Sequence, residues 1–166
     1  MTRTITPTYV LLNQITLAAS ASSVTFSNIP QTFGDLVLIM EHTTSVAANK
    51  LVRFNGDGGS NYPWVYMGGN GTSAISGTNT STSLLVEALA AGSTTERLLT
   101  IVNIMDYSAT DKHKTALTRN GRASQGTDAI ACRWANTAAI TSISIELNNS
   151  ASFPSASTFS LYGVFA

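Results

Sequence analysis

Two histidines, His42 and His113, are the general-base candidates whose usual pKa lies closest to neutral pH. His113 ends the segment Asp106–His113, which combines hydroxyls, carboxylates and an imidazole. A hydrolase would need a nucleophile held beside its base, and the sequence contains no Gly-x-Ser-x-Gly motif. His42 follows Glu41 at the end of an apolar run, which is typical of a strand-end residue that faces water or an interface. We therefore predict no catalytic residues and no enzymatic activity.

The segment Asn55–Asn61 alternates oxygen-bearing side chains with glycines, as a calcium loop does. It lacks the further carboxylates and the closing Glu of such a loop, so we interpret it as a turn and predict no metal site. The single cysteine, Cys132, excludes an intrachain disulfide and shares a strand face with Ile130 and Trp134. This pattern predicts a buried structural thiol. No glycine-rich phosphate loop is present, and we predict no cofactor.

Three aromatic residues, Tyr62, Trp64 and Tyr66, occupy alternate positions, so on a strand they share one face. An exposed set of this kind would form a platform on which sugar rings stack. Inward-facing aromatics of a sandwich core produce the same spacing more often, and we favour that interpretation. The glycan platform stays open as the alternative.

Basic residues cluster between Lys112 and Arg133, against the single acidic residue Asp128. We favour a solvated strand–loop–strand unit here. The alternative is a basic face that docks on an acidic partner surface. Its candidate contacts are Lys112, Lys114, Arg119 and Arg122.

About a quarter of the residues are Ser or Thr, whereas only 11% are charged. The hydroxyls alternate with apolar residues, as in Ser142–Leu147, which is the pattern of a strand with one buried face. Acidic and basic residues are equal in number, nine each, which argues against a general nucleic-acid-binding protein. Little charge repulsion keeps copies of such a protein apart, so the composition suits a protein that packs against neighbours.

Apolar or alternating segments separated by Gly, Ser and Asn turns predict nine or ten strands. They cover residues 9–17, 22–29, 36–40, 51–54, 62–67, 98–107, 114–120, 129–134, 141–147 and 158–165. This pattern predicts an all-β, antiparallel two-sheet sandwich, jelly-roll-like, with at most one short helix. Leu36–Met40 is apolar on both faces, which predicts a central strand covered on both sides.

The remaining segments receive looser predictions. Gly68–Thr82 is almost wholly Gly, Ser, Thr and Asn, which predicts a long functional or mobile loop. Ser83–Ala91 combines features of a helix and of a strand, and we leave both open. Residues 1–8 predict an extended arm and residues 9–166 a single domain. The arm contributes further candidate partner contacts, namely Thr2, Arg3, Thr4 and Ile5.

The first twenty residues contain an apolar patch, Tyr9–Leu12, that stops at Asn13. A signal peptide uses an apolar region of roughly 7–15 residues, so we predict no signal peptide and synthesis in the cytoplasm of the host cell. No run approaches the roughly 20 apolar residues of a membrane-spanning helix, and we predict no membrane partner.

Three segments resemble small structural proteins from the virions of tailed bacteriophages. They are Ala21–Leu38, then Arg53–Asp57 followed by Asn61-Tyr62, and finally Phe153–Val164. The similarity covers most of the chain but is weak from Gly68 to Asn136. These are strand and turn signatures, so the resemblance carries over no catalytic residue.

The resemblance implies a jelly-roll-like module of the capsid surface, the tail or a fibre. A chain of this length fits best with a capsid decoration (cement) protein that binds the outer shell as a dimer or trimer. Its expected partners are the major capsid protein and copies of itself. The alternative is a tail or fibre module that binds a host surface glycan.

Overall fold

The computed structural model describes residues 7–89 and 92–165, and within them the chain is all-β and antiparallel, as the alternation predicts. The arm residues Thr2 to Ile5 lie outside the described residues. Eleven strands are present: β1 (Tyr9–Thr16), β2 (Ser23–Phe26), β3 (Asp35–His42), β4 (Lys50–Phe54), β5 (Tyr62–Gly69), β6 (Ala74–Ser81), β7 (Leu98–Met105), β8 (Lys114–Arg122), β9 (Gly126–Trp134), β10 (Ile143–Leu147) and β11 (Thr158–Val164).

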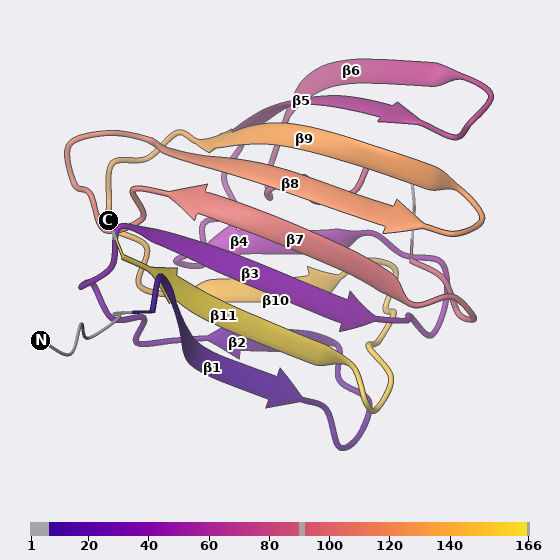
Figure 1. The fold of residues 1–166 in the computed structure, drawn as a ribbon, viewed down its shortest axis with the longest axis horizontal. Coiled ribbons are helices and arrows are strands. Elements are labelled where there is room, and N and C mark those ends of the chain that lie inside the picture. The colour runs from indigo at the N-terminus through magenta and orange to yellow at the C-terminus, as the bar shows by residue number, and fades with distance from the viewer. Residues whose placement is uncertain (1–6, 90–91, 166) are drawn as a thin grey trace, which may run out of the picture.

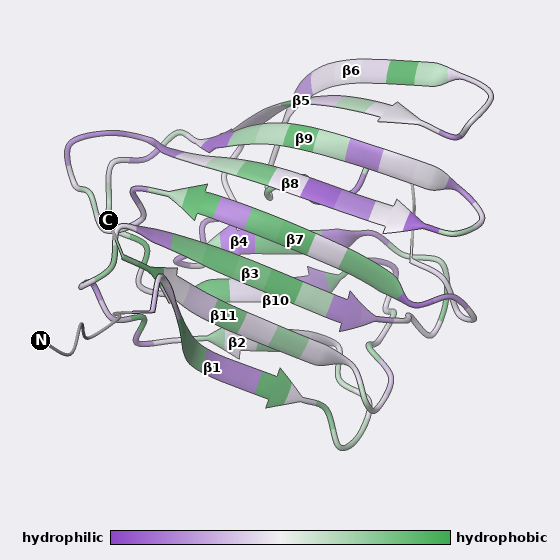
Figure 2. Ribbon diagram, viewed as in Figure 1, coloured by the Kyte–Doolittle hydropathy of each residue, from purple (hydrophilic) through white to green (hydrophobic). Residues whose placement is uncertain are grey.

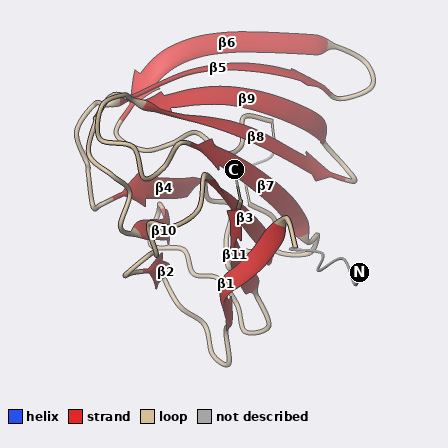
Figure 3. Ribbon diagram, turned by 60° about the vertical axis from the view of Figure 1, so that its left-hand side comes forward, coloured by secondary structure: helices blue, strands red, loops and turns tan. Residues whose placement is uncertain are grey.

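The strands form two layers of unequal size (Figure 1). Eight strands make a large sheet in the order β1-β11-β3-β7-β8-β9-β5-β6, and three make a small sheet in the order β2-β10-β4. Figure 3 shows the small sheet lying against one side of the large sheet. The prediction of an antiparallel two-sheet sandwich is therefore confirmed.

The core lies between the two sheets and follows from strand alternation. Ile143, Ile145 and Leu147 of β10 point inward and are buried, as the alternating pattern of this segment predicts. From the large sheet, Leu38 and Val102 meet them in one hydrophobic cluster. Burial of each such side chain contributes about 1.5–3 kcal/mol, so this shared core holds the two layers together. Figure 2 shows the hydrophobic segments repeating along β3 and β7.

The prediction of a long loop over Gly68–Thr82 is wrong, because most of that segment forms a β-hairpin. β5 extends to Gly69 and pairs with β6, an edge strand of the large sheet. Asn70 Oδ1 accepts hydrogen bonds from the backbone N–H groups of Thr72 and Ser73 and so closes the turn. Since most β6 side chains are exposed, this strand needs no alternating apolar residues to fold.

The helix considered for Ser83–Ala91 is absent from residues 83–89, which the structure describes. Leu84 forms an isolated bridge with Val52 of the small sheet. Further on, the backbone N–H groups of Ala88 and Leu89 donate to Asp128 Oδ2, at 2.8 and 2.9 Å. A carboxylate from β9 thus satisfies donors that a helix would have used internally.

Candidate functional site

The face of the large sheet that points away from the small sheet is rich in exposed apolar side chains. We call it the outer face; alternate residues of all eight strands form it. Among the described residues nine large hydrophobic side chains are exposed, and only Val46 and Phe165 of these lie elsewhere. Single exposed apolar residues are normal, but their concentration on one face indicates an interaction surface. The seven on the outer face are Tyr9, Leu11, Val65, Met67, Leu99, Met105 and Leu117.

The strand register makes these side chains neighbours. Val65 pairs with Ala131, and Ala131 pairs in turn with Leu117, so one apolar row crosses β5, β9 and β8. Residues paired across strands lie about 4.5–5.5 Å apart and pack against one another. A second row therefore lies beside the first, and it consists of Met67, Ala129, Arg119, Ile101 and Ile39.

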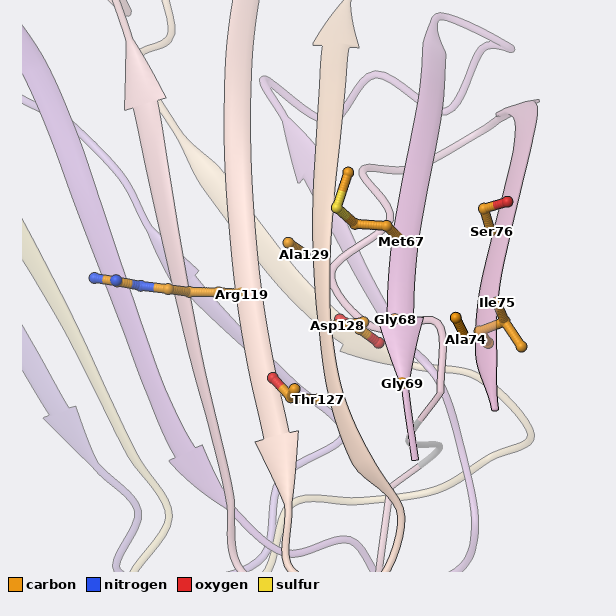
Figure 4. A pocket seen from close by; sticks show the side chains of 10 residues that line it. All are labelled: Met67, Gly68, Gly69, Ala74, Ile75, Ser76, Arg119, Thr127, Asp128 and Ala129. Atoms are coloured by element: carbon orange, nitrogen blue, oxygen red, sulfur yellow. The ribbon is translucent and has the colours of Figure 1, made fainter. Parts of the chain in front are cut away.

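Shallow hollows lie between the side chains of this face. Figure 4 shows one of them, where Met67 lies close to Ala129 and Arg119 extends away across the sheet. A second hollow surrounds Val65 and Leu117. Small-molecule sites usually enclose their ligand and direct several polar groups at it. These hollows are open and mostly apolar, so we interpret them as shallow depressions in a protein-binding surface.

The four charged side chains of the outer face are separated by sign, with the acidic and the basic residues on different strands. Asp35 and Glu41 belong to β3, whereas Arg119 belongs to β8 and Arg133 to β9. Within residues 7–89 and 92–165, neither arginine has an ion-pair partner. The face therefore has an acidic side and a basic side, with the apolar residues of β7 and β8 between them.

The basic residues predicted as a docking face are not gathered into one. Lys112 lies in the loop before β8, with its Nζ 3.2 Å from Asp106 Oδ2. Arg122 ends β8, with its Nε 3.1 Å from Glu96 Oε2. Arg119 lies between them on the outer face. A nine-residue strand is about 30 Å long, so Lys112 and Arg122 serve opposite ends of the sheet.

Lys114, a candidate partner contact under the alternative interpretation, has a buried side chain, with 1% of its surface exposed. Its Nζ donates to the carbonyl oxygens of Lys112 and Thr137, at 3.0 and 2.8 Å, and lies 6.0 Å from the centre of a Trp134 ring. Burial lowers the pKa of Lys114, although the Asp111 carboxylate opposes that shift. The residue starts the inward-facing set of β8, which its sequence neighbours do not reveal.

The aromatic residues of β5 share one face, as predicted, but that face points inward. Tyr62 is fully buried; its hydroxyl donates to Asp57 O and accepts from Phe54 N, both at 3.1 Å. Burial raises the pKa of Tyr62 to about 12. Trp64 and Tyr66 are partly buried, with ring centres 5.8 Å apart. The core interpretation therefore holds for Tyr62 and in part for Trp64, and the three rings do not form one exposed platform.

His42 does not face water or an interface, because it falls on the inner face of β3. Its ring centre lies 5.0 Å from that of Phe153 and 6.2 Å from that of Phe159. Burial, with the nearby Lys50 ammonium, lowers the pKa of His42 to about 3, so the imidazole is neutral at physiological pH. His113 is exposed in the loop before β8. The two imidazoles thus lie in unrelated surroundings.

Cys132 is buried, as its strand face predicts, and burial raises the pKa of its thiol to about 11. Such a thiol is a poor nucleophile at neutral pH. The buried ion pair between Lys50 and Glu87, which the sequence did not indicate, packs beside the core. The Lys50 ammonium and the Glu87 carboxylate neutralise each other, and Glu87 Oε1 also accepts a 2.8 Å hydrogen bond from Lys50 N.

The segment Asn55–Asn61 is a turn tied together by one carboxylate. Asp57 accepts hydrogen bonds from the side chains of Asn61 and Trp134 and from the backbone N–H of Gly59. Its oxygens thus point at N–H donors inside the protein. No group of three or more His, Cys, Asp or Glu side chains suited to a metal ion occurs in the described parts of the chain.

The apolar residues of the outer face are the part of the site that sequence reasoning missed. One sequence feature could have indicated this face: a strand with apolar residues at its odd and its even positions has an apolar side chain on both faces of the sheet. In β7 both Leu98 and Leu99 are apolar, yet only Leu98 is buried. An antiparallel sheet that faces water usually shows polar residues on that side.

No helix within residues 7–89 and 92–165 is long and apolar enough to cross a membrane. Comparison of the chain with protein-family models, with curated proteins and with solved structures finds no match.

Proposed function

We propose that this chain is a structural protein of a bacteriophage virion, specifically a capsid decoration (cement) protein that binds the outer surface of the shell. The observation that carries the proposal is the outer face, where seven of nine exposed large hydrophobic side chains gather. A weakly charged sheet face of this kind is suited to burial against protein. The proposed role needs neither a reaction nor a cofactor.

The resemblance to phage virion proteins supports the part of this proposal that concerns the β-sandwich framework. The segment 21–38 forms β2 and begins β3, and the segment 153–164 ends in β11, which pairs with β3. The turn at Asn55–Asp57 links β4 to β5. None of the seven exposed large hydrophobic residues of the outer face lies in the segments that carry the resemblance, and three of them, Leu99, Met105 and Leu117, come from the stretch in which it is weak. A shared scaffold with an individual binding face suits proteins that attach to different shells.

In the proposed mechanism, a decoration protein stabilises a shell by burying surface on more than one subunit. A stable interface buries about 1,200–2,000 Å² in total, and repetition over the shell adds avidity. The partners in this mechanism are the major capsid protein and further copies of the chain. Thr2 to Ile5 and the exposed Lys112 remain candidate contacts with the shell.

A tail module that binds a host glycan draws no support from the aromatic residues. Tyr62 belongs to the core, and Trp64 packs against it, so the three exposed rings that this alternative requires are not present together.

The test is reconstitution on particles of the parent phage from which the gene has been deleted. We expect the purified chain to bind the shell at a fixed number of copies per particle and to raise the temperature at which the particle releases DNA. A variant lacking residues 1–6 should keep its fold and bind less. Binding confined to tails, or absent from shells, would contradict the proposal.

A further inference from the structure

The outer face lacks the second covering layer that its sequence predicts. Leu36–Met40 is apolar on both sides, and β7 repeats this pattern. The small sheet covers the inner side of these strands, whereas no strand of the described chain lies over the outer side (Figures 1 and 3). An antiparallel sheet with one face exposed to solvent usually has polar residues on that face, whereas this one has Ile39, Ile101 and Leu117 there. A second molecule can supply this layer.

The outer face is large enough for a stable interface by itself. Eight strands about 4.8 Å apart and about eight residues long give a footprint of about 34 by 26 Å, or about 900 Å². A standard stable interface buries about 800 Å² on each partner. One copy of the same face would therefore suffice as a cover.

The charges of the face fit a second copy better than an unrelated surface. Asp35 and Glu41 lie on one side of the boundary between β7 and β8, and Arg119 and Arg133 lie on the other. Asp35 and Arg133 lie on the same row of the register, three strands apart. Asp35 precedes the pair Leu36–Ile104 and so lies level with Met105, Met105 pairs with Thr115, and Thr115 pairs with Arg133. A twofold rotation about the boundary exchanges the two sides and leaves the row unchanged.

We propose that two copies of this chain pair outer face to outer face, about a twofold axis that runs parallel to the strands between β7 and β8. This rotation places Asp35 opposite Arg133 of the second copy. It also brings Glu41 near Arg119 of the second copy, one row and one strand away. Each contact occurs twice, and the apolar rows of β7, β8 and β9 are buried between them.

The charged residues keep their contacts within the chain in this arrangement. Asp35 Oδ1 accepts a 2.8 Å hydrogen bond from Asp106 N, and Glu41 Oε1 lies 2.9 Å from Arg97 Nε. In the proposed dimer, the second oxygen of each carboxylate accepts the partner's arginine. The pairing therefore supplements existing contacts, and Arg119 and Arg133 gain ion-pair partners.

This inference rests on the proposed function in one respect: it assigns the face from which that function is argued to a second copy. The candidate contacts left for the shell are then Lys112 and Thr2 to Ile5. The first test is sedimentation equilibrium of the full chain, free of any particle. Val65→Asp and Leu117→Asp should each weaken dimerisation at least about thirtyfold. Val46→Asp is the matched control, because Val46 is 48% exposed and Val65 is 52% exposed, but Val46 lies in a loop outside the face.

The second test uses the twofold symmetry and does not depend on one variant's stability. Asp35→Lys and Arg133→Asp each place like charges opposite each other, so each variant alone should dimerise about tenfold more weakly or worse. Mixed in equal amounts, they restore two opposite-charge pairs and should form a heterodimer with near wild-type affinity. Circular dichroism and thermal melting establish that each variant is folded.

Three results would overturn the inference: a monomeric wild-type chain, dimers that survive both outer-face substitutions, or folded single variants whose mixture shows no recovery. Dimers that survive these substitutions would place the contact at an edge strand such as β6. Particle binding is scored separately. If the chain forms a dimer that does not bind shells, the proposed function is contradicted. If it binds shells as a monomer, only this inference is contradicted.

Discussion

Trp134 Nε1 donates a 2.7 Å hydrogen bond to Asp57 Oδ2, which ties the last residue of β9 to the turn after β4. This contact joins the large sheet to the small sheet at one end of the sandwich. The Trp134 ring also packs edge-on against Phe54, with ring centres 5.6 Å apart. One carboxylate in a turn therefore positions the largest side chain of the core.

Asp57→Ala should destabilise the fold by about 2–3 kcal/mol, because it removes charge-assisted hydrogen bonds and leaves the Trp134 N–H without its acceptor. The hydrogen bond from Trp134, with those from Asn61 and Gly59, lowers the pKa of Asp57 below its usual 3.8. This contribution is present above pH 3.8 and disappears as the pH falls through the lower folded-state value. Denaturant unfolding measures the loss, with Asp111→Ala as the exposed control; equal stability of the two variants would contradict the assignment.

The buried pair Lys50–Glu87 should be sensitive to removal of one partner only. Glu87→Ala leaves the Lys50 ammonium buried without its carboxylate and should cost about 3–5 kcal/mol. The double variant Lys50→Met with Glu87→Leu replaces both charges by apolar groups and should recover most of that loss. A double variant as unstable as Glu87→Ala would show that the charges themselves are required.

His42 should make the protein less stable in mild acid. Its pKa is about 3 in the folded protein, against its usual value of 6.5, so folding favours the neutral imidazole. That stabilisation is fully present above pH 6.5 and is lost as the pH falls, by about 2 kcal/mol at pH 5. His42→Leu should flatten unfolding free energy between pH 7 and pH 5, whereas His113→Asn should not. Parallel pH profiles for wild type and His42→Leu would refute this.

Two glycines with positive φ should differ in their tolerance of a side chain. A Cβ at Gly126 would lie 2.2 Å from Gly69 O, whereas a Cβ at Gly71 would meet nothing within 4 Å. Gly71→Ala should therefore cost about 1 kcal/mol, from its backbone conformation alone. Gly126→Ala should cost about 2–3 kcal/mol or more, because the backbone of the β5–β6 hairpin must also move. Thermal melting of the two variants measures the difference.

Strand alternation predicted most of the fold, because most strands that pack on the core have an apolar inner set; β8, whose inner set is Lys114, Ala116, Thr118 and Asn120, is an exception. β10 was recognisable from Ile143, Ile145 and Leu147 alone. β6 was not, since an edge strand with exposed Ser, Thr and Asn residues has no such set. The segment after it is held by Asp128, a residue some 40 positions away, and local patterns do not report such a contact.

The candidate site was harder to predict than the fold. Charge counting placed Lys114 and Arg119 in one basic face, although their offset of five positions along the strand puts one inside and the other outside. Alternation can assign two residues to opposite faces, but it does not say which face is covered. That information came from the small sheet, which covers only the inner side of β7 and β8.

Imaging of the assembled particle at side-chain resolution tests the central claim most directly. We expect density for this chain on the outer surface of the shell, with Val65, Met67 and Leu117 of every copy buried against protein. The chain at another position, or on the shell with its outer face bare to solvent, would contradict it.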